Sequence, residues 1–199
     1  FRRVLFRSLW SDRGYGPGLS ALLLQLLMAD PYPLPLPTTV VIGEDAVRQR
    51  DLAPLAPWLA LDPAALLRQG DQLVLEFDWP RPAEDPRELS EITDLRLWSL
   101  RADALCPWLP LVLERSSGQL TRHVAMLLPH GFSRTEGIRF APEALELWIT
   151  HRLFALDGWA HAHGLQCRQG LTQMAAVLGF ELDATFWHLP QPPGSDGDG

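Results

Sequence analysis

The sequence predicts an α+β domain in which an antiparallel sheet is packed by helices from the C-terminal part of the chain. Two observations support this prediction. Apolar and polar residues alternate, as in half-buried strands, in several segments between residues 38 and 128. From Pro142 onward the apolar residues instead follow the 3.6-residue period of an amphipathic helix. Strands first and helices last are typical of an α+β domain.

Five segments are predicted as strands. The segment TTVVIG is rich in β-branched residues and ends at Gly43. The segment DQLVLEFDW places Leu73, Leu75 and Phe77 on one face. LRLWSLRAD alternates in the same way, and WLPLVLE and LTRHVAMLL flank RSSGQ, whose serines and glycine are typical of a hairpin turn. The predicted strands lie near residues 38–42, 71–78, 95–102, 109–114 and 120–128.

The remaining segments favour helices. Residues 44–70 are helical in tendency but interrupted by prolines, with Asp62 as an N-cap before Pro63 and Gly70 at the end. Pro142 suits the first position of a long helix that Gly164 ends. The predicted C-terminal helices lie near residues 142–163, 168–178 and 182–188.

The predicted single domain covers residues 38–189. Residues 1–37 are interpreted as an unstructured or artefactual leader, because FRRVLFRS at 1–8 is a translation of the end of a common sequencing adapter. Met28 is the expected native start, and residues 9–27 are left open between a genuine extension and untranslated sequence. The tail at 190–199 has nothing to bury and is expected to be disordered.

Composition argues against several classes of function. The chain of 199 residues has a formal charge of −7, and all of its 17 basic residues are arginine, so non-specific nucleic-acid binding is not expected. The longest apolar run, at residues 19–29, is shorter than the roughly 20 residues of a membrane-spanning helix. Cys106 and Cys167 lack any CxxC companion, which favours a reduced, intracellular protein over one with a single disulfide, and Cys106 is interpreted as a small buried side chain.

The histidines and serines do not form a recognisable metal or catalytic motif. His161 and His163 are two positions apart on a predicted helix and point in different directions, so no metal or other cofactor is expected. His130 and Ser133 are close in sequence, but nothing resembles the GxSxG motif and no third residue is seen to orient them. An enzyme with an unrecognised pocket, using His130 as its acid–base group, is kept as an alternative.

Eight tryptophans are more than a domain of this size usually needs for its core. Tryptophan and arginine are favoured as anchors in protein–protein interfaces. Partner binding therefore competes with core packing as the explanation for this composition.

Three long segments carry a resemblance to a known family, namely DPRELSEITDLRLWSLRADALCPWLPLVLE (85–114), VAMLLPHGFSRTEGIRFAPEALELWITHRLFAL (124–156) and LTQMAAVLGFELDATFW (171–187). Together they resemble the chlororespiratory reduction six family of cyanobacteria and chloroplasts. The resemblance implies a non-enzymatic factor that helps to build the ferredoxin-accepting peripheral arm of the photosynthetic NAD(P)H dehydrogenase-like complex. It further implies an iron–sulfur subunit as the client protein, and a cytoplasmic location that becomes stromal in plants. A constitutive subunit of the complex is a further alternative.

The motifs of this resemblance lie in two polar loops, at residues 85–94 and 129–140, which we expect to form one client-binding surface. Arginines would contact client carboxylates, glutamates would orient them, and Phe132 would be the apolar anchor. The other interpretation is that the charged residues only fasten the second loop to the following helix. The predicted partner-binding residues are Arg87, Glu88, Ser90, Glu91, Trp98, His130, Phe132, Ser133, Arg134, Glu136 and Arg139.

Overall fold

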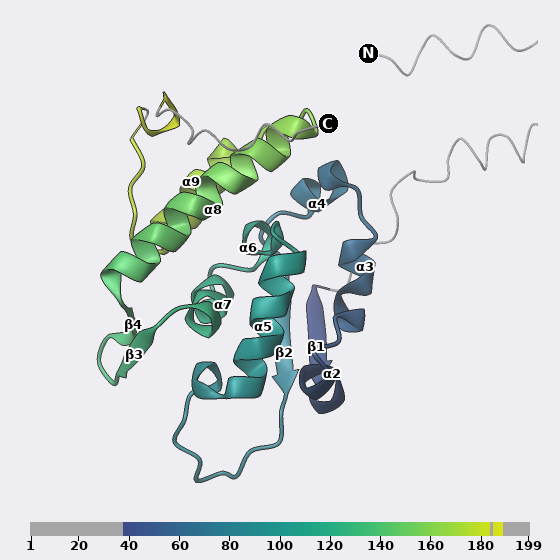
Figure 1. Cartoon of the computed structure of the whole chain (residues 1–199), viewed down its shortest axis with the longest axis vertical. Coiled ribbons are helices and arrows are strands. Elements are labelled where there is room, and N and C mark those ends of the chain that lie inside the picture. The colour runs from purple at the N-terminus through teal and green to yellow at the C-terminus, as the bar shows by residue number, and fades with distance from the viewer. Residues whose placement is uncertain (1–37, 184, 189–199) are drawn as a thin grey trace, which may run out of the picture. The chain divides into compact units, whose positions relative to one another are not determined.

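Two short two-stranded sheets and a larger set of helices make up the part of the chain that the structure describes, residues 38–183 and 185–188 (Figure 1). The structure is a computed structural model. All described residues lie within one of the two compact units into which the chain divides, residues 37–199. The predicted α+β class is confirmed. The predicted leader and tail lie outside the described residues.

The first sheet pairs β1 (Thr39–Gly43) with β2 (Val74–Asp78), so these two predicted strands are confirmed. The prediction that they belong to an antiparallel sheet is wrong, because they run parallel and Val40 lies beside Leu75. The physical reason is the connection: parallel strands need a long crossover, and this one is helical. It contains α2 (Glu44–Gln49), η1 (Ala53–Leu55), α3 (Ala56–Leu59) and α4 (Pro63–Gln69). The predicted cap of α4 is confirmed, since Asp62 accepts a hydrogen bond from the Ala65 N–H at 2.8 Å.

The three strands predicted near 95–102, 109–114 and 120–128 are wrong, because these segments form helices. They are α5 (Thr93–Leu105), α6 (Leu109–Val112) and α7 (Gln119–Leu127). In α5 the buried residues are Leu95, Trp98, Ser99 and Ala102, which is helical spacing. Leu97 and Leu100 are apolar but exposed, so the sequence shows an alternation that a strand would also produce.

The segment RSSGQ is a connection between helices and not the predicted hairpin turn. The side chain of Glu114 accepts hydrogen bonds from the hydroxyls of Ser116 and Ser117 and from their backbone N–H groups. These bonds, the hydroxyl of Ser116 first, lower the pKa of Glu114 to about 2. Gly118 then adopts a φ of 80°, which favours glycine, immediately before α7 begins.

The second sheet is a hairpin inside the motif loop 129–140, where no strand was predicted. Here β3 (His130–Ser133) pairs antiparallel with β4 (Gly137–Phe140), and Phe132 lies opposite Ile138. The Ser133 hydroxyl closes the turn by accepting hydrogen bonds from the N–H groups of Thr135 and Glu136, both at 3.3 Å. The motif loop is therefore an ordered hairpin between α7 and α8.

The C-terminal helices are confirmed for the first two segments. α8 (Pro142–Ala162) and α9 (Arg168–Val177) lie side by side, and α6 also contacts α9 (Figure 1). The third predicted helix, near 182–188, is reduced among the described residues to a short 3₁₀ turn, η3 (Phe186–His188). The buried stripe of α8 consists of Leu145, Ile149, Leu153, Leu156 and Ala160 together with one charged residue, Arg152.

Arg152 belongs to a buried charged cluster that joins three helices. Asp103 on α5 accepts a hydrogen bond from Arg152 on α8 and also contacts His123 on α7, with 3.2 Å between the Asp103 Oδ1 and His123 Nε2 atoms. Arg152 and His123 are only 8% and 4% exposed. Asp103 thus supplies the carboxylate for two buried nitrogen-bearing side chains, of which Arg152 also donates to the Pro107 carbonyl at 3.4 Å.

Both cysteines are free and buried, which confirms the interpretation of Cys106 as a small buried side chain. Burial raises the pKa of the Cys106 and Cys167 thiols to about 11. At neutral pH they are protonated and behave as small apolar side chains.

Candidate functional site

The two predicted motif loops meet in the structure through one hydrogen bond. The first loop ends in η2 (Leu89–Glu91), and the Ser90 hydroxyl lies 2.9 Å from Nε2 of His130 on β3. Ser90 is 5% exposed, so this contact is sheltered from water. The expectation that residues 85–94 and 129–140 lie together is therefore fulfilled at this point.

Both ring nitrogens of His130 have a partner. Nδ1 lies 3.1 Å from the carbonyl oxygen of Leu128. A carbonyl oxygen can only accept, so in the neutral ring Nδ1 carries the proton and Nε2 accepts from the Ser90 hydroxyl. The group that orients the imidazole is a backbone carbonyl, whereas the catalytic triad places a carboxylate there. Ser133, the serine considered for catalysis, instead closes the hairpin turn.

The charged residues of the first loop mainly stabilise the loop itself. Glu88 and Glu91 form a reciprocal capping box around η2, in which the Glu88 N–H donates to Glu91 at 2.7 Å. Arg87 pairs with Asp85 at 2.7 Å, and this hydrogen-bonded guanidinium lowers the pKa of Asp85 to about 2. Arg81 donates to the backbone carbonyls of Asp85 and Arg87. A rigid loop results.

The hairpin presents the side chains that have no internal role. Phe132 is 56% exposed. Arg134 is exposed and makes no hydrogen bond or ion pair with any residue that the structure describes. Arg139 and Glu136 form an ion pair at 3.3 Å, with side chains 69% and 62% exposed. Beside them is an open hollow of about 520 Å³, lined by residues 129–133 and 139–141.

Trp98 does not lie on this surface, so its predicted partner-binding role is not matched by its position. It is fully buried on α5, its indole N–H donates to the carbonyl oxygen of Asp51 at 2.7 Å, and its ring packs edge-on against Phe77. The reason is the error at residues 95–102: in a helix, position 98 falls on the same face as Leu95 and Ala102.

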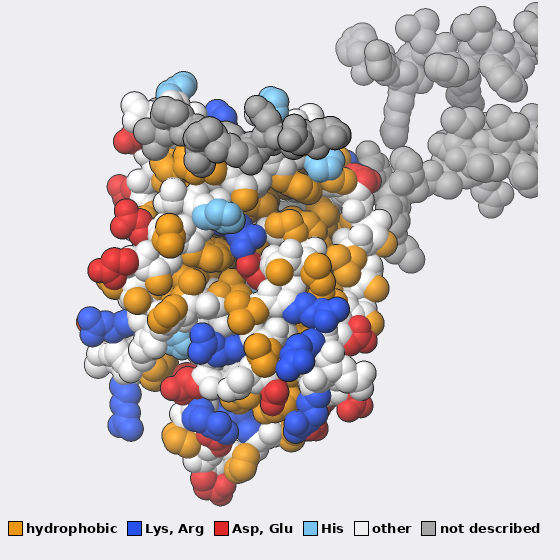
Figure 2. Space-filling model, viewed as in Figure 1, with side chains coloured by type: hydrophobic (Ala, Val, Ile, Leu, Met, Phe, Trp, Pro, Cys, Tyr) orange, Lys and Arg blue, Asp and Glu red, His pale blue; other side chains and the backbone are white. Residues whose placement is uncertain are grey.

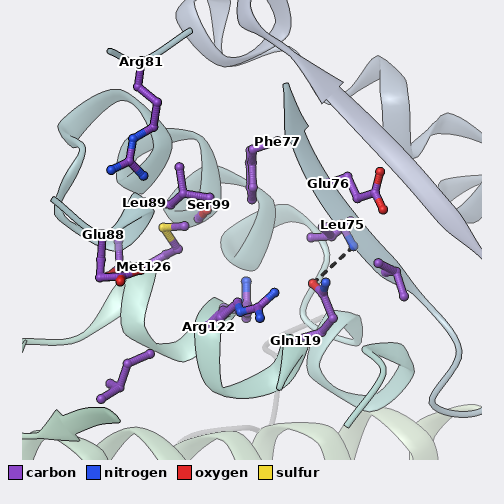
Figure 3. A pocket seen from close by; sticks show the side chains of 14 residues that line it. Leu75, Glu76, Phe77, Arg81, Glu88, Leu89, Ser99, Gln119, Arg122 and Met126 are labelled. Atoms are coloured by element: carbon purple, nitrogen blue, oxygen red, sulfur yellow. Dashed lines mark hydrogen bonds between the residues drawn. The ribbon is translucent and has the colours of Figure 1, made fainter. Parts of the chain in front are cut away.

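Sequence reasoning missed a cavity of about 600 Å³ behind the first motif loop (Figure 3). Its lining combines residues from β2, α5, α7, η2 and β4. Four of the five buried polar or charged side chains among the described residues line it, namely Ser90, Ser99, Gln119 and His123. Polar residues at helical spacing in 95–126 are the signal that could have revealed it, but only after these segments were recognised as helices.

Arginine side chains gather on part of the face drawn in Figure 2. They lie mainly over its lower half, with hydrophobic and acidic side chains among them, while hydrophobic side chains fill much of the upper half. An acidic chain therefore carries a face rich in arginine, the residue best suited to bidentate contacts with carboxylates.

Neither a metal-binding cluster nor a membrane-spanning helix is found among the described residues. No group of three or more His, Cys, Asp or Glu side chains there is arranged to hold a metal ion. None of the helices formed by residues 38–183 and 185–188 is both long and apolar enough to cross a bilayer.

Comparison with known protein families gives a match that includes both motif loops. No solved structure matches the chain. The model of the family described as chlororespiratory reduction 6 matches residues 42–189, which include both motif loops, the hairpin and every lining residue of the cavity. The chain therefore belongs to the chlororespiratory reduction 6 family, which is linked to assembly of the NAD(P)H dehydrogenase-like complex.

Proposed function

We propose that this protein is a non-enzymatic assembly factor that binds an iron–sulfur subunit of the peripheral, ferredoxin-accepting arm in the cytoplasm while that arm is built. The observation that carries the proposal is the Ser90–His130 hydrogen bond, because it holds the two motif loops as one surface. We call this the motif surface: residues 85–91 and 129–140. Its exposed side chains include Phe132 and Arg134.

The motif surface has the chemistry of a protein-binding site. Phe132 leaves more than half of its side chain in water, and burying an aromatic side chain against a partner contributes on the order of 1.5–3 kcal/mol. Arg134 has all its guanidinium donors available to a client carboxylate. The exposed Arg139–Glu136 ion pair contributes about 0–1 kcal/mol to the stability of the fold. A partner can therefore replace it with new contacts at little cost in stability.

The same residues give less support to catalysis by His130. Its two nitrogens are engaged by Ser90 and the Leu128 carbonyl, and Ser133 is engaged in the turn. The hollow beside the hairpin is open, whereas general acid–base catalysis depends on an enclosed site that shifts pKa values. Recognition is the better account of this geometry.

The proposal predicts that the motif surface is needed to assemble the complex. In cells that lack this protein, the Phe132→Ala/Arg134→Ala double variant should restore less than about a tenth of the assembled complex that the wild-type chain restores, because the two anchors together contribute roughly 2–4 kcal/mol to client binding. The matched control is Leu105→Ala, an exposed apolar residue at the end of α5 whose exposed fraction, 58%, is close to the 56% of Phe132. The assembled complex is quantified by native gel electrophoresis.

Two results would contradict the proposal. Full assembly with the double variant, at normal levels of the variant protein, would show that the motif surface is not used. Stoichiometric presence of the protein in the purified mature complex would identify it as a constitutive subunit.

A further inference from the structure

The strand β2 has one paired edge and one incomplete edge. The Val74 N–H donates to the Thr38 carbonyl oxygen at 2.7 Å, on the side of β1. Backbone groups alternate in direction along a strand, so Leu75 and Phe77 direct theirs to the opposite side. That edge is paired only at its start, where Leu73 bonds to the backbone of residues 112 and 114 at 2.8 and 2.9 Å.

After Leu73, the side chain of Gln119 occupies the position that a third strand would take. The Leu75 N–H donates to Oε1 of Gln119 at the long distance of 3.3 Å. The Leu75 carbonyl and the Phe77 N–H have no hydrogen-bond partner among the described residues. Residues 74–77 line the 600 Å³ cavity, so this unpaired backbone opens into it.

The cavity lining carries several hydrogen-bond donors that have no partner among the described residues. Ser99 is 1% exposed, and its hydroxyl bonds to no described residue. The Gln119 amide nitrogen and the Arg122 guanidinium are likewise without a partner in that part of the chain. Figure 3 shows Arg81 reaching in from one side and Arg122 from α7 on the other. Such a site favours a ligand that carries acceptors and negative charge.

The acidic side chains on the cavity lining do not satisfy these donors. The Glu88 carboxylate is already engaged in the capping box of η2. Glu76 points to the opposite face of β2 from Leu75 and Phe77, because side chains alternate along a strand. The walls between the charged groups are apolar and include Leu89, Met126 and Ile138.

We propose that the 600 Å³ cavity along the unpaired edge of β2, which we call the groove, binds an extended acidic segment of a partner protein. This segment adds to β2 as a third strand. Its backbone pairs with the Leu75 carbonyl and the Phe77 N–H, and apolar side chains lie against the walls. A carboxylate side chain meets Arg122 and the remaining donors of Arg81, whose Nη2 already donates to the Asp85 and Arg87 carbonyls. About four residues are covered, matching positions 74–77. The groove continues the motif surface, since residues 88–90 line both. The identification of this partner as the client subunit rests on the proposed function. The inference that the groove binds an acidic strand does not depend on that function.

The test is an NMR titration of the isotope-labelled full chain with a pentapeptide of alternating valine and glutamate, capped at both ends. We expect saturable shifts of the Phe77 backbone amide and the Gln119 side-chain amide at millimolar peptide. An analogue with glutamine for glutamate should bind at least about tenfold more weakly, because it loses the charge-assisted contacts. An analogue with N-methylated backbone amides should not bind, because it cannot pair with the strand edge.

Variants of the protein locate the carboxylate contact. Arg122→Gln should weaken peptide binding about tenfold, as expected for the loss of one charge-assisted contact. Arg101→Gln should leave binding unchanged, because Arg101 is exposed on α5 and does not line the groove. Retained folding of both variants is checked by their amide spectra.

Several outcomes would overturn the inference. These are the absence of shifts at millimolar peptide, equal binding of the N-methylated analogue, and no effect of Arg122→Gln. Tighter binding of an uncapped valine–glutamine peptide would also overturn it, by pointing to a chain-terminal carboxylate instead of a side chain. Client binding that persists when the peptide fails rejects only the groove, whereas peptide binding without client binding rejects the proposed function.

Discussion

Replacing Trp98 by alanine should lower the free energy of unfolding by about 3–5 kcal/mol, the usual loss for a buried tryptophan. Trp98 is fully buried, and its ring centroid lies 5.5 Å from that of Phe77 in an edge-on arrangement. Truncation would also leave the Asp51 carbonyl without the indole donor that now lies at 2.7 Å. Denaturant unfolding followed by circular dichroism measures the change.

The control for this prediction is Trp98→Phe, which keeps an aromatic ring on α5 but removes the indole N–H. It should cost less than the alanine variant, because only the hydrogen bond and part of the packing are lost. A Trp98→Ala variant of nearly wild-type stability that no longer binds its partner would contradict the structure. It would restore the sequence-based interpretation of Trp98 as a surface anchor.

Replacing Asp103 by alanine should lower the free energy of unfolding by about 3–5 kcal/mol, because it removes one member of a buried ion pair. Arg152, 8% exposed, would keep a buried charge without its carboxylate. His123 would lose the contact at 3.2 Å that now joins α7 to α5. Thermal and denaturant unfolding of the variant measure the loss.

Two further variants test whether the loss of stability comes from a buried unpaired charge or from the loss of any charged side chain. Glu136→Ala breaks an exposed pair with Arg139 and should change stability by less than about 1 kcal/mol. Arg152→Met in the Asp103→Ala background should recover part of the stability, because the unpaired charge is then absent. Equal losses of unfolding free energy for Asp103→Ala and Glu136→Ala would show that the buried ion pair stabilises the fold no more than the exposed one.

The parts of the fold that the sequence predicts are those with an unambiguous local pattern. The stripe from Leu145 to Ala160 repeats over enough turns to exclude a strand, and Asp62 with Pro63 marks a helix start. Residues 95–128 lack such a pattern. Exposed Leu97 and Leu100 fill positions that a helix usually gives to polar residues, so tertiary packing decides their structure.

The candidate site is predicted only where its residues are close in sequence or carry the family motifs. Phe132 and Arg134 are exposed on the motif hairpin. The Ser90–His130 contact joins residues that are far apart in the chain, and the resemblance, not the spacing, associated them. The groove at β2 combines residues from five elements, so it exists only after the chain has folded.

The central claim, that the motif surface binds an iron–sulfur subunit of the peripheral arm, is tested most directly by calorimetric titration of that purified subunit. The wild-type chain and Leu105→Ala should bind it with equal affinity. The Phe132→Ala/Arg134→Ala variant should bind about thirty- to several-hundredfold more weakly, since the two anchors together contribute roughly 2–4 kcal/mol. Equal binding by all three chains, or no binding by the wild-type chain, would contradict the account.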